Sequence, residues 1–226
     1  MVKFENVTKK FGETAALNHA SFEIKKGEFV FVIGCSGAGK TTLVKLILRE
    51  YLPTEGTITV SGLDLQDLRK KEIPDYRKKI GVVFQDFRLL TDRTVFENVA
   101  IALRILREKQ EDIDERVETI LDLTGLKDKK DFFPSQLSGG ELQRTCLARA
   151  VVTDPDILIA DEPTGNLDIG IARQIVEIFQ KINEAGKIVI MATHNFEIVN
   201  KMSKRVIELD NGKIVSDKKK GKYHLP

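Results

Sequence analysis

The sequence predicts an α/β fold with a mainly parallel core sheet, an N-terminal antiparallel β subdomain and an inserted helical lobe. Three observations lead to this prediction. The apolar run 29–33 is followed by a glycine-rich loop, 34–39, and then by a helical pattern, which is a strand–loop–helix order typical of α/β proteins. A strand–helix–strand pattern recurs at 157–192, and a crossover of that length implies parallel strands. Between these segments, from about residue 86 to 150, apolar residues follow helical spacing.

The first third of the chain is expected to form short strands. Apolar and polar residues alternate at 22–24 and 58–60, which indicates a sheet with one solvated face. A later apolar run, 80–84, is of the buried-strand kind and ends at Gln85. The expected strands of this part are 2–7, 20–24, 29–33, 57–60 and 80–84.

Helical spacing begins after Gln85. Apolar residues repeat at 3–4-residue intervals in 95–106 and again in 117–123, just before Gly125. The charge run between them, 107–112, is interpreted as a solvated face or loop. These patterns predict a helical lobe.

Sheet structure is expected to return in the last third of the chain. Strands at 157–160 and 188–192 flank a helix at 171–182, and Asn211-Gly212 joins two short runs as a hairpin turn. The whole chain, 1–226, is expected to be one domain. Its core would comprise 1–85 and 151–226, and its helical lobe 86–150.

Composition places the chain among ordinary globular proteins. It has 226 residues, 42% hydrophobic and 31% charged, and a net charge of only +2, which gives no sign of a nucleic-acid partner. No apolar run approaches the roughly 18 residues of a membrane span, and the N-terminus lacks a signal-peptide pattern. We therefore expect a cytoplasmic protein whose membrane role, if any, needs a separate partner. Two cysteines in unrelated segments indicate no disulfide framework.

The glycine-rich loop fits the pattern G-x-x-x-x-G-K-[ST] without a gap. Its glycines permit successive backbone N–H groups to face an anion, and the helix that follows adds the positive end of its dipole. Lys40 can reach β- and γ-phosphates, and the Thr41 hydroxyl can ligate Mg²⁺. A tight turn between core elements would explain the glycines but not Lys40-Thr41. The predicted nucleoside-triphosphate site comprises Gly34, Cys35, Ser36, Gly37, Ala38, Gly39, Lys40, Thr41 and Thr42.

Two adjacent carboxylates follow the buried strand 157–160. In P-loop enzymes an acid at the end of this strand holds Mg²⁺, and we assign this role to Asp161. The next residue, Glu162, can orient or deprotonate the water that attacks the γ-phosphate. The alternative is a pair of surface acids that end a strand. The Lys40-Thr41 motif upstream favours the functional interpretation of the two acids.

A second anion site is predicted far from the first in the sequence. Ser138 is a good helix N-cap, and Gly139 and Gly140 leave backbone amides open at the helix start. A simple helix cap is the alternative. The segment 137–144, Leu-Ser-Gly-Gly-Glu-Leu-Gln-Arg, resembles the signature of ATP-binding-cassette (ABC) ATPases. The resemblance extends from residue 2 to about 215 and implies a RecA-like core.

This resemblance implies roles for further residues. Phe11 matches the aromatic residue that stacks on adenine, and Gln85 matches the glutamine that touches Mg²⁺ and relays to a membrane partner. Asp168, in the loop 165–168, matches the segment that crosses the dimer, and His194 matches the histidine that contacts the γ-phosphate. The implied catalytic residues are Glu162, His194, Gln85 and Lys40, and the implied metal ligands are Thr41, Gln85 and Asp161.

The resemblance also implies partners. In this family two ATP molecules are sandwiched between two cassettes, so that the Lys40 loop of one chain would face the Ser138 loop of a second copy. ATP and Mg²⁺ are the implied cofactors. The γ-phosphate would favour the closed dimer, hydrolysis would release it, and a partner gripping the helical lobe would move.

Three segments resemble the bacterial cell-division members of the family: 83–90, 94–100 and 192–195. This resemblance implies a polytopic membrane partner, cytoplasmic division proteins as further partners, a place on the inner face of the membrane, and control of peptidoglycan hydrolases. One alternative is the ATPase of a lipoprotein-release or macrolide-type exporter. A soluble ATPase acting on DNA or ribosomes is disfavoured by the lack of a coiled-coil insertion, and a nucleotide sensor is disfavoured by Glu162.

Overall fold

The core of the protein is a six-stranded sheet. The computed structural model describes residues 1–165 and 167–221. Strand order in this sheet is β10-β9-β3-β8-β7-β6, and its neighbours pair in parallel except for the antiparallel β9–β10 pair. The prediction of a mainly parallel sheet is thus confirmed. The strands are β3 (Phe29–Ile33), β6 (Ile80–Val83), β7 (Ile157–Asp161), β8 (Ile188–Ala192), β9 (Arg205–Asp210) and β10 (Lys213–Lys218).

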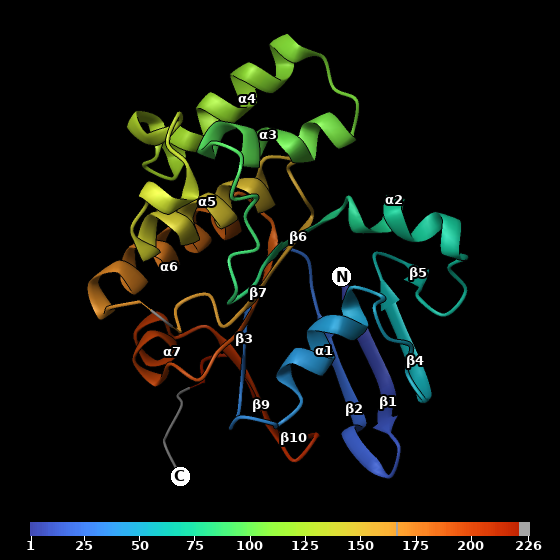
Figure 1. Cartoon of the computed structure of the whole chain (residues 1–226). Helices are drawn as coiled ribbons and strands as arrows, with labels where there is room; N and C mark the ends of the chain where they lie inside the picture. The colour runs from blue at the N-terminus through green and yellow to red at the C-terminus, as the bar shows by residue number, and fades with distance from the viewer. Residues whose placement is uncertain (166, 222–226) are drawn as a thin grey trace.

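A second, antiparallel sheet lies beside the core, with strand order β2-β1-β4-β5. In Figure 1 its strands stand to one side of the molecule, next to helix α1 (Lys40–Ile47). This confirms the predicted antiparallel subdomain. Strands β1 and β2 are longer than expected, and register shifts interrupt their pairing. The strands are β1 (Val2–Phe11), β2 (Thr14–Ile24), β4 (Glu55–Val60) and β5 (Leu63–Asp64).

Both faces of the core sheet are buried. Along β3, Val30 and Val32 belong to the apolar cluster shared with α1 and the antiparallel sheet. Phe29 and Phe31 point to the other face, where helices α5 and α6 cover the sheet. Since side chains alternate along a strand, burial on both sides requires the continuous apolar runs seen in the sequence.

Three helices form the lobe above the sheet: α3 (Val95–Ile105), α4 (Gln110–Leu123) and α5 (Gly139–Val151) (Figure 1). The first of them begins at a capping box, in which Thr94 and Glu97 satisfy each other's backbone N–H groups. The helices share a buried apolar cluster of their own. Helix α5 also contributes to the core cluster, so it joins the lobe to the sheet.

Several helix boundaries differ from those expected. Helix α4 starts at Gln110, inside the charge run interpreted as loop or solvated face, since acidic residues suit the positive end of a helix. Two short helices were not predicted, α2 (Ile73–Arg77) and α7 (Phe196–Met202), whereas α6 (Ile169–Glu184) was. Within residues 1–165 and 167–221, no helix combines the length and apolar character needed to cross a bilayer.

Arg205 ties the sheets together at their edge. Its guanidinium donates two hydrogen bonds to the Asp217 carboxylate, at 2.7 and 2.8 Å. It donates two more, to Glu28 Oε2 at 2.9 Å and to the Glu23 carbonyl at 2.7 Å. The side chain is only 15% exposed, so these contacts are largely shielded from water.

We expect Arg205→Met to lower the free energy of unfolding by about 2–4 kcal/mol, because it strands partly buried carboxylates. For a chain of this size that corresponds to a fall in the melting temperature of about 4–16 °C. Arg69→Met is the matched control, because the Arg69–Glu72 pair is exposed to solvent and should contribute little to stability. Urea-induced unfolding measures the free energy of unfolding of both variants. Equal decreases in the two variants would show that the Arg205 hydrogen bonds do not stabilise the contact between the sheets.

Candidate active site

The loop between β3 and α1 is shaped by its glycines. Gly34, Gly37 and Gly39 have φ values of 148°, 82° and 108°. A Cβ on Gly39 would lie 2.4 Å from the Ala16 carbonyl oxygen, and one on Gly34 would lie 2.3 Å from a carbonyl oxygen of β9. Helix α1 starts without a side-chain cap and without an acid in its first turn. Its first N–H groups and its positive dipole end are therefore open to an anion.

Lys40 folds back over this loop. Its ammonium group donates hydrogen bonds to the carbonyls of Gly34, at 2.8 Å, and Cys35, at 3.1 Å. It also lies 3.7 Å from Glu162 Oε1. The residue is only 7% exposed, so its charge acts in a largely shielded place.

A cavity of about 550 Å³ opens over the loop, within the size range of small-molecule sites. It gathers residues from β2, from the loop and α1, and from the ends of β6, β7 and β8. Nearly all of its lining was predicted, and Ala16, whose carbonyl touches Gly39, was missed. The cavity is lined by Ala16, Cys35, Ser36, Gly37, Gly39, Lys40, Thr41, Thr42, Gln85, Glu162 and His194.

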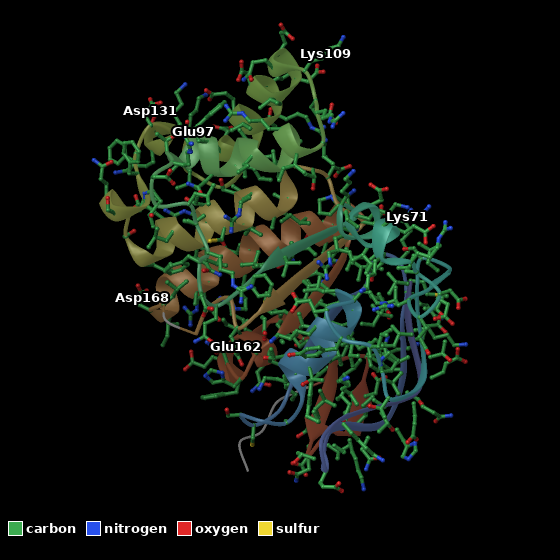
Figure 2. The ribbon with its side chains drawn as sticks, turned by 45° about the vertical axis from the view of Figure 1, so that its right-hand side comes forward. Lys71, Glu97, Lys109, Asp131, Glu162 and Asp168 are labelled. Atoms are coloured by element: carbon green, nitrogen blue, oxygen red, sulfur yellow. The ribbon has the colours of Figure 1, made fainter. Side chains whose placement is uncertain are left out.

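Glu162 sits at the centre of this cavity's charged groups. Its Oε2 lies 2.9 Å from His194 Nδ1 and accepts the His194 backbone N–H at 3.3 Å. In the view of Figure 2, Asp168 lies at the left-hand edge of the molecule and Glu162 lies inward of it. Its backbone is left-handed, with φ of 52°, a strained conformation for a residue with a side chain. The carboxylate, held between Lys40 and His194, faces the space above the loop.

Asp161 is the buried neighbour of Glu162. Its carboxyl accepts a hydrogen bond from the Thr41 hydroxyl, while Oδ1 has no hydrogen-bond partner. Within residues 1–165 and 167–221, no group of three or more His, Cys, Asp or Glu side chains could hold a metal. An orphaned carboxylate oxygen beside a hydroxyl nonetheless fits a hard cation that takes its other oxygen ligands from water and phosphate.

The pKa of Asp161 is raised from its ordinary value of 3.8, chiefly by burial of its carboxyl group. Because the folded pKa exceeds the unfolded one, the folded state binds more protons between the two values, and stability falls as pH rises through that window. We expect Asp161→Asn to melt at a higher temperature than the parent at pH 7 without nucleotide and to lose much of this pH dependence. It should gain less stability from ATP and Mg²⁺. Calorimetric melting from pH 4 to 8 checks both effects, and a less stable variant at pH 7 would contradict them.

Ser138 caps helix α5 in a reciprocal arrangement with Glu141. The Ser138 hydroxyl donates to Glu141 Oε2 at 2.7 Å, and the Ser138 N–H donates to the same oxygen at 2.8 Å. These bonds lower the pKa of Glu141, the hydroxyl bond most of all. Gly140 lies against α6, because a Cβ there would be 2.6 Å from the Ile171 side chain. The helix start is thus closely packed on α6.

Eight predicted site residues do not line the cavity over the loop. Asp168 caps α6 by accepting the Ile171 N–H at 2.9 Å, and its neighbour Asn166 lies outside the described residues. Phe11 is 46% exposed and stands edge-on to Tyr51, with ring centres 5.1 Å apart. Three of the eight, Gly34, Ala38 and Asp161, lie next to lining residues in the sequence, and the other five are Phe11, Ser138, Gly139, Gly140 and Asp168. The aromatic partner Tyr51 was not predicted, since no motif marks it.

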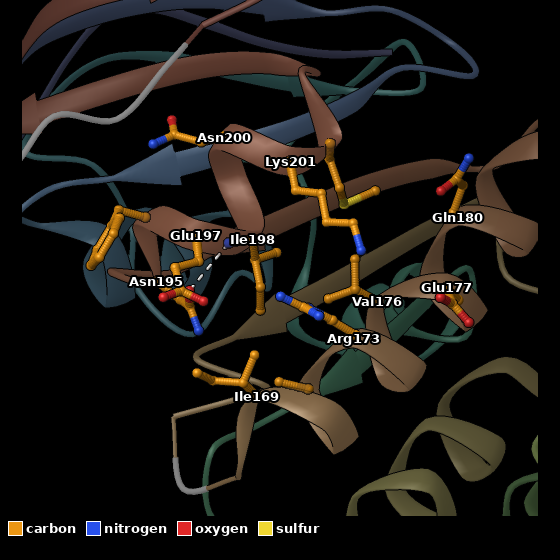
Figure 3. Close-up of a pocket in the computed structure, with 13 residues that line it drawn as sticks. Ile169, Arg173, Val176, Glu177, Gln180, Asn195, Glu197, Ile198, Asn200 and Lys201 are labelled. Carbon is orange, nitrogen blue, oxygen red and sulfur yellow. Dashed lines mark hydrogen bonds between the residues drawn. The ribbon is translucent and has the colours of Figure 1, made fainter.

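A larger cavity, of about 670 Å³, lies between α6 and α7. Figure 3 shows Ile198 and Val176 between the two helices, with Arg173 and Lys201 nearby. It has no phosphate-binding loop, and its charged side chains carry both signs. We therefore place the nucleotide over the loop around Lys40.

Comparison with known proteins agrees with this geometry. The model of the ABC transporter family matches residues 17–165, and the chain belongs to that family. Its relatives include the cell division ATP-binding proteins FtsE. The protein of that name from Bacillus subtilis (strain 168) is 51% identical over 224 residues, covering 99% of this chain and 98% of the relative. The one from Escherichia coli (strain K12) is 46% identical over 213 residues, covering 94% and 96%.

Solved structures of ABC transporter proteins have the same fold as this chain. The dimeric bacterial ABC transporter cassette MJ0796 superposes with a TM-score of 0.88 at 36% identity, over 99% of this chain and 100% of that one. Another MJ0796 structure, with the same match, is a post-hydrolysis state bound to ADP and Pi. The cbiO1 protein from Clostridium perfringens superposes at 0.90 with 29% identity, over 96% and 88%. The chain is therefore an ATP-binding and ATP-hydrolysing cassette of the cell-division type.

Proposed function

We propose that the chain is the ATPase subunit of a bacterial cell-division complex, in which two copies act with a polytopic membrane protein of the FtsX type. ATP cycling in this complex would control peptidoglycan hydrolases. The observation that carries the proposal is the cavity over the Lys40 loop, where Glu162 and His194 face the predicted phosphate position, in a chain 51% identical to an FtsE protein. The chain would lie in the cytoplasm, on the inner face of the membrane, as one cassette spanning 1–226 with its lobe at 86–150.

Within the cavity, each predicted residue has a physical task. The loop amides and Lys40 would bind the β- and γ-phosphates, and Lys40 would exchange its bonds to the loop carbonyls for bonds to phosphate oxygens. Glu162 would position and deprotonate the attacking water, and His194 would hold that carboxylate and contact the γ-phosphate.

Mg²⁺ would be held by Thr41, Asp161 and Gln85, all near the loop. When bound, the ion would neutralise charge on the phosphates. The orphaned Oδ1 of Asp161 supports this assignment, because a cation would satisfy it. Phe11, exposed and backed by Tyr51, would offer its ring to adenine.

The second anion site would serve the ATP of the other copy. Ser138, Gly139 and Gly140 lie outside the cavity of their own chain, at the start of α5, where Ser138 is the N-cap. To bind a γ-phosphate, Ser138 would have to turn its hydroxyl away from Glu141. Asp168, which ends the loop after β7, would contact the partner cassette beside it.

An ATP-dependent pull-down from detergent-solubilised membranes tests the proposal. The bait is the tagged Glu162→Gln chain, and Lys40→Met, which should not retain ATP, is the control bait. Recovery of a permease with a large extracytoplasmic segment and attached hydrolase regulators, only with Glu162→Gln and ATP, is the expected result. Recovery of exporter or lipoprotein-release subunits would overturn the cell-division role and keep the site.

A further inference from the structure

The segment that links β6 to α3, residues 84–94, is bound to the helical lobe by side chains. Asn98, fully buried in α3, binds the end of this linker. Its Oδ1 accepts the Leu90 N–H at 2.8 Å, and its amide group donates to the carbonyls of Leu90, Arg93 and Thr94 at 2.9–3.1 Å. The other end of the linker, at Gln85, lies in the nucleotide cavity.

Helix α5 binds the middle of the same linker. The Arg149 guanidinium donates to the Arg88 carbonyl at 2.7 Å and to the Phe87 carbonyl at 3.1 Å. Cys146, one turn earlier on the same helix face, donates its thiol hydrogen to the Phe87 carbonyl at 2.9 Å. Burial raises the pKa of this thiol to about 12, so it stays protonated and remains a donor at neutral pH.

The Arg149 contact is unusual for a charged side chain. The residue is half-buried, and burial lowers the pKa of its guanidinium. The hydrogen bonds found for it within residues 1–165 and 167–221 go to the two linker carbonyls, and no carboxylate pairs with it there. A half-buried cation that has only main-chain acceptors gains less than one paired with a carboxylate, which favours a functional over a purely stabilising role.

One helix thus carries two sites. Its first residues are the predicted signature, Ser138 to Gly140, and its last turns hold the linker two residues beyond Gln85. The helix has 13 residues and is about 20 Å long, a rigid element. A movement of the signature, caused by ATP on a second cassette, would be transmitted through Arg149 to the linker of its own chain.

We propose that Arg149, assisted by Cys146, is a positioning residue that couples the signature helix to Gln85, so that nucleotide binding at one site of the dimer places Gln85 in the other. This proposal rests on the proposed function, specifically on the cross-dimer signature and on Gln85 as a Mg²⁺ ligand. According to this proposal, cooperativity between the two nucleotide sites of the dimer depends on the hydrogen bonds from Arg149 to the carbonyls of Phe87 and Arg88.

Steady-state ATP hydrolysis by the purified full chain, measured over a range of ATP concentrations, tests the proposal. For Arg149→Met we expect kcat to fall about 10-fold, KM to change less than about 3-fold, and the Hill coefficient to fall towards 1, because the contact matters for the coupled step more than for binding. Arg149→Lys, which can still reach one carbonyl, should recover part of the Hill coefficient. Cys146→Ala removes the weaker donor and should show the same trend on a smaller scale.

Arg205→Met is the matched control, a half-buried arginine whose loss should lower stability without changing the Hill coefficient. If Arg149→Met destabilises the chain but keeps the parent kcat and Hill coefficient, the coupling role is wrong. If it does not fold, Arg149→Lys and Cys146→Ala decide by the same criteria. Gln85→Ala separates the two proposals: parent-like activity in that variant would overturn the role of Gln85, whereas a loss there with parent-like Arg149 variants would overturn only the coupling.

Discussion

Glu162→Gln should retain ATP binding and lose turnover by about 100- to 10,000-fold, the usual contribution of a general base. The Glu162 carboxylate lies 3.7 Å from the Lys40 ammonium group and 2.9 Å from His194 Nδ1. Among the described residues that line the cavity, Glu162 is the one with an acidic side chain. An amide of the same shape cannot accept the proton of the attacking water. It also no longer draws Lys40 away from phosphate, so ATP should dissociate more slowly. Single-turnover hydrolysis measures the loss of turnover, and light scattering with ATP detects the ATP-bound dimer that should accumulate when ATP dissociates slowly.

Glu177→Gln is the matched control for that change. Glu177 is an exposed glutamate of α6 that lines the cavity between α6 and α7, away from the Lys40 loop. It should hydrolyse ATP at the parent rate and should not accumulate as an ATP-bound dimer. Near-normal hydrolysis by Glu162→Gln would mean that another group activates the water, and the assignment of the base would be withdrawn.

Lys40→Met should weaken binding of a non-hydrolysable ATP analogue by about 30- to 1,000-fold, the equivalent of losing a shielded charge pair of about 2–4 kcal/mol. Methionine keeps the apolar stem of the side chain but loses the ammonium group. The loss has two causes: the phosphates lose a cation, and the carbonyls of Gly34 and Cys35 lose their hydrogen-bond donor. Isothermal titration calorimetry measures the dissociation constant.

Lys45→Met is the corresponding control, one turn further along α1. The Lys45 ammonium lies 5.4 Å from the centre of the Tyr51 ring and makes no contact with the loop carbonyls that hold Lys40. The dissociation constant of Lys45→Met should stay within about 3-fold of the parent, since the half-buried Lys45 side chain does not line the cavity over the loop. Equal losses in both variants would indicate a general effect of charge on α1 rather than a specific phosphate contact.

The parts of the site that depend on neighbouring residues could be predicted from the sequence. The order of apolar run, glycine loop, Lys40 and Thr41 predicted the strand, the loop and the helix together. The carboxylates of Asp161 and Glu162 were found because they end a buried apolar run. Each of these features is a pattern of a few consecutive residues, so it needs no knowledge of the tertiary structure.

Contacts between distant segments could not be predicted in this way. Arg149 meets the Phe87 carbonyl across 62 residues of sequence, and its acceptor is main chain, which leaves no mark in the amino-acid pattern. Tyr51 was missed because the Phe11 ring that it contacts is far away in the sequence. Helix α7 has only seven residues, too few for a helical period to show, and its N-cap Asn195 is also part of the His194 segment.

The contacts of Lys40 with protein oxygens affect how products are released. Its cation already has two carbonyl oxygens and a nearby carboxylate, so a departing nucleotide does not leave a bare charge behind in a shielded cavity. Nucleotide binding is then an exchange of oxygen partners around one nitrogen, in which the old contacts offset part of the gain from the new ones. Such an arrangement limits how tightly ADP can be retained, and it suits a cassette that must empty and refill continually rather than store its ligand.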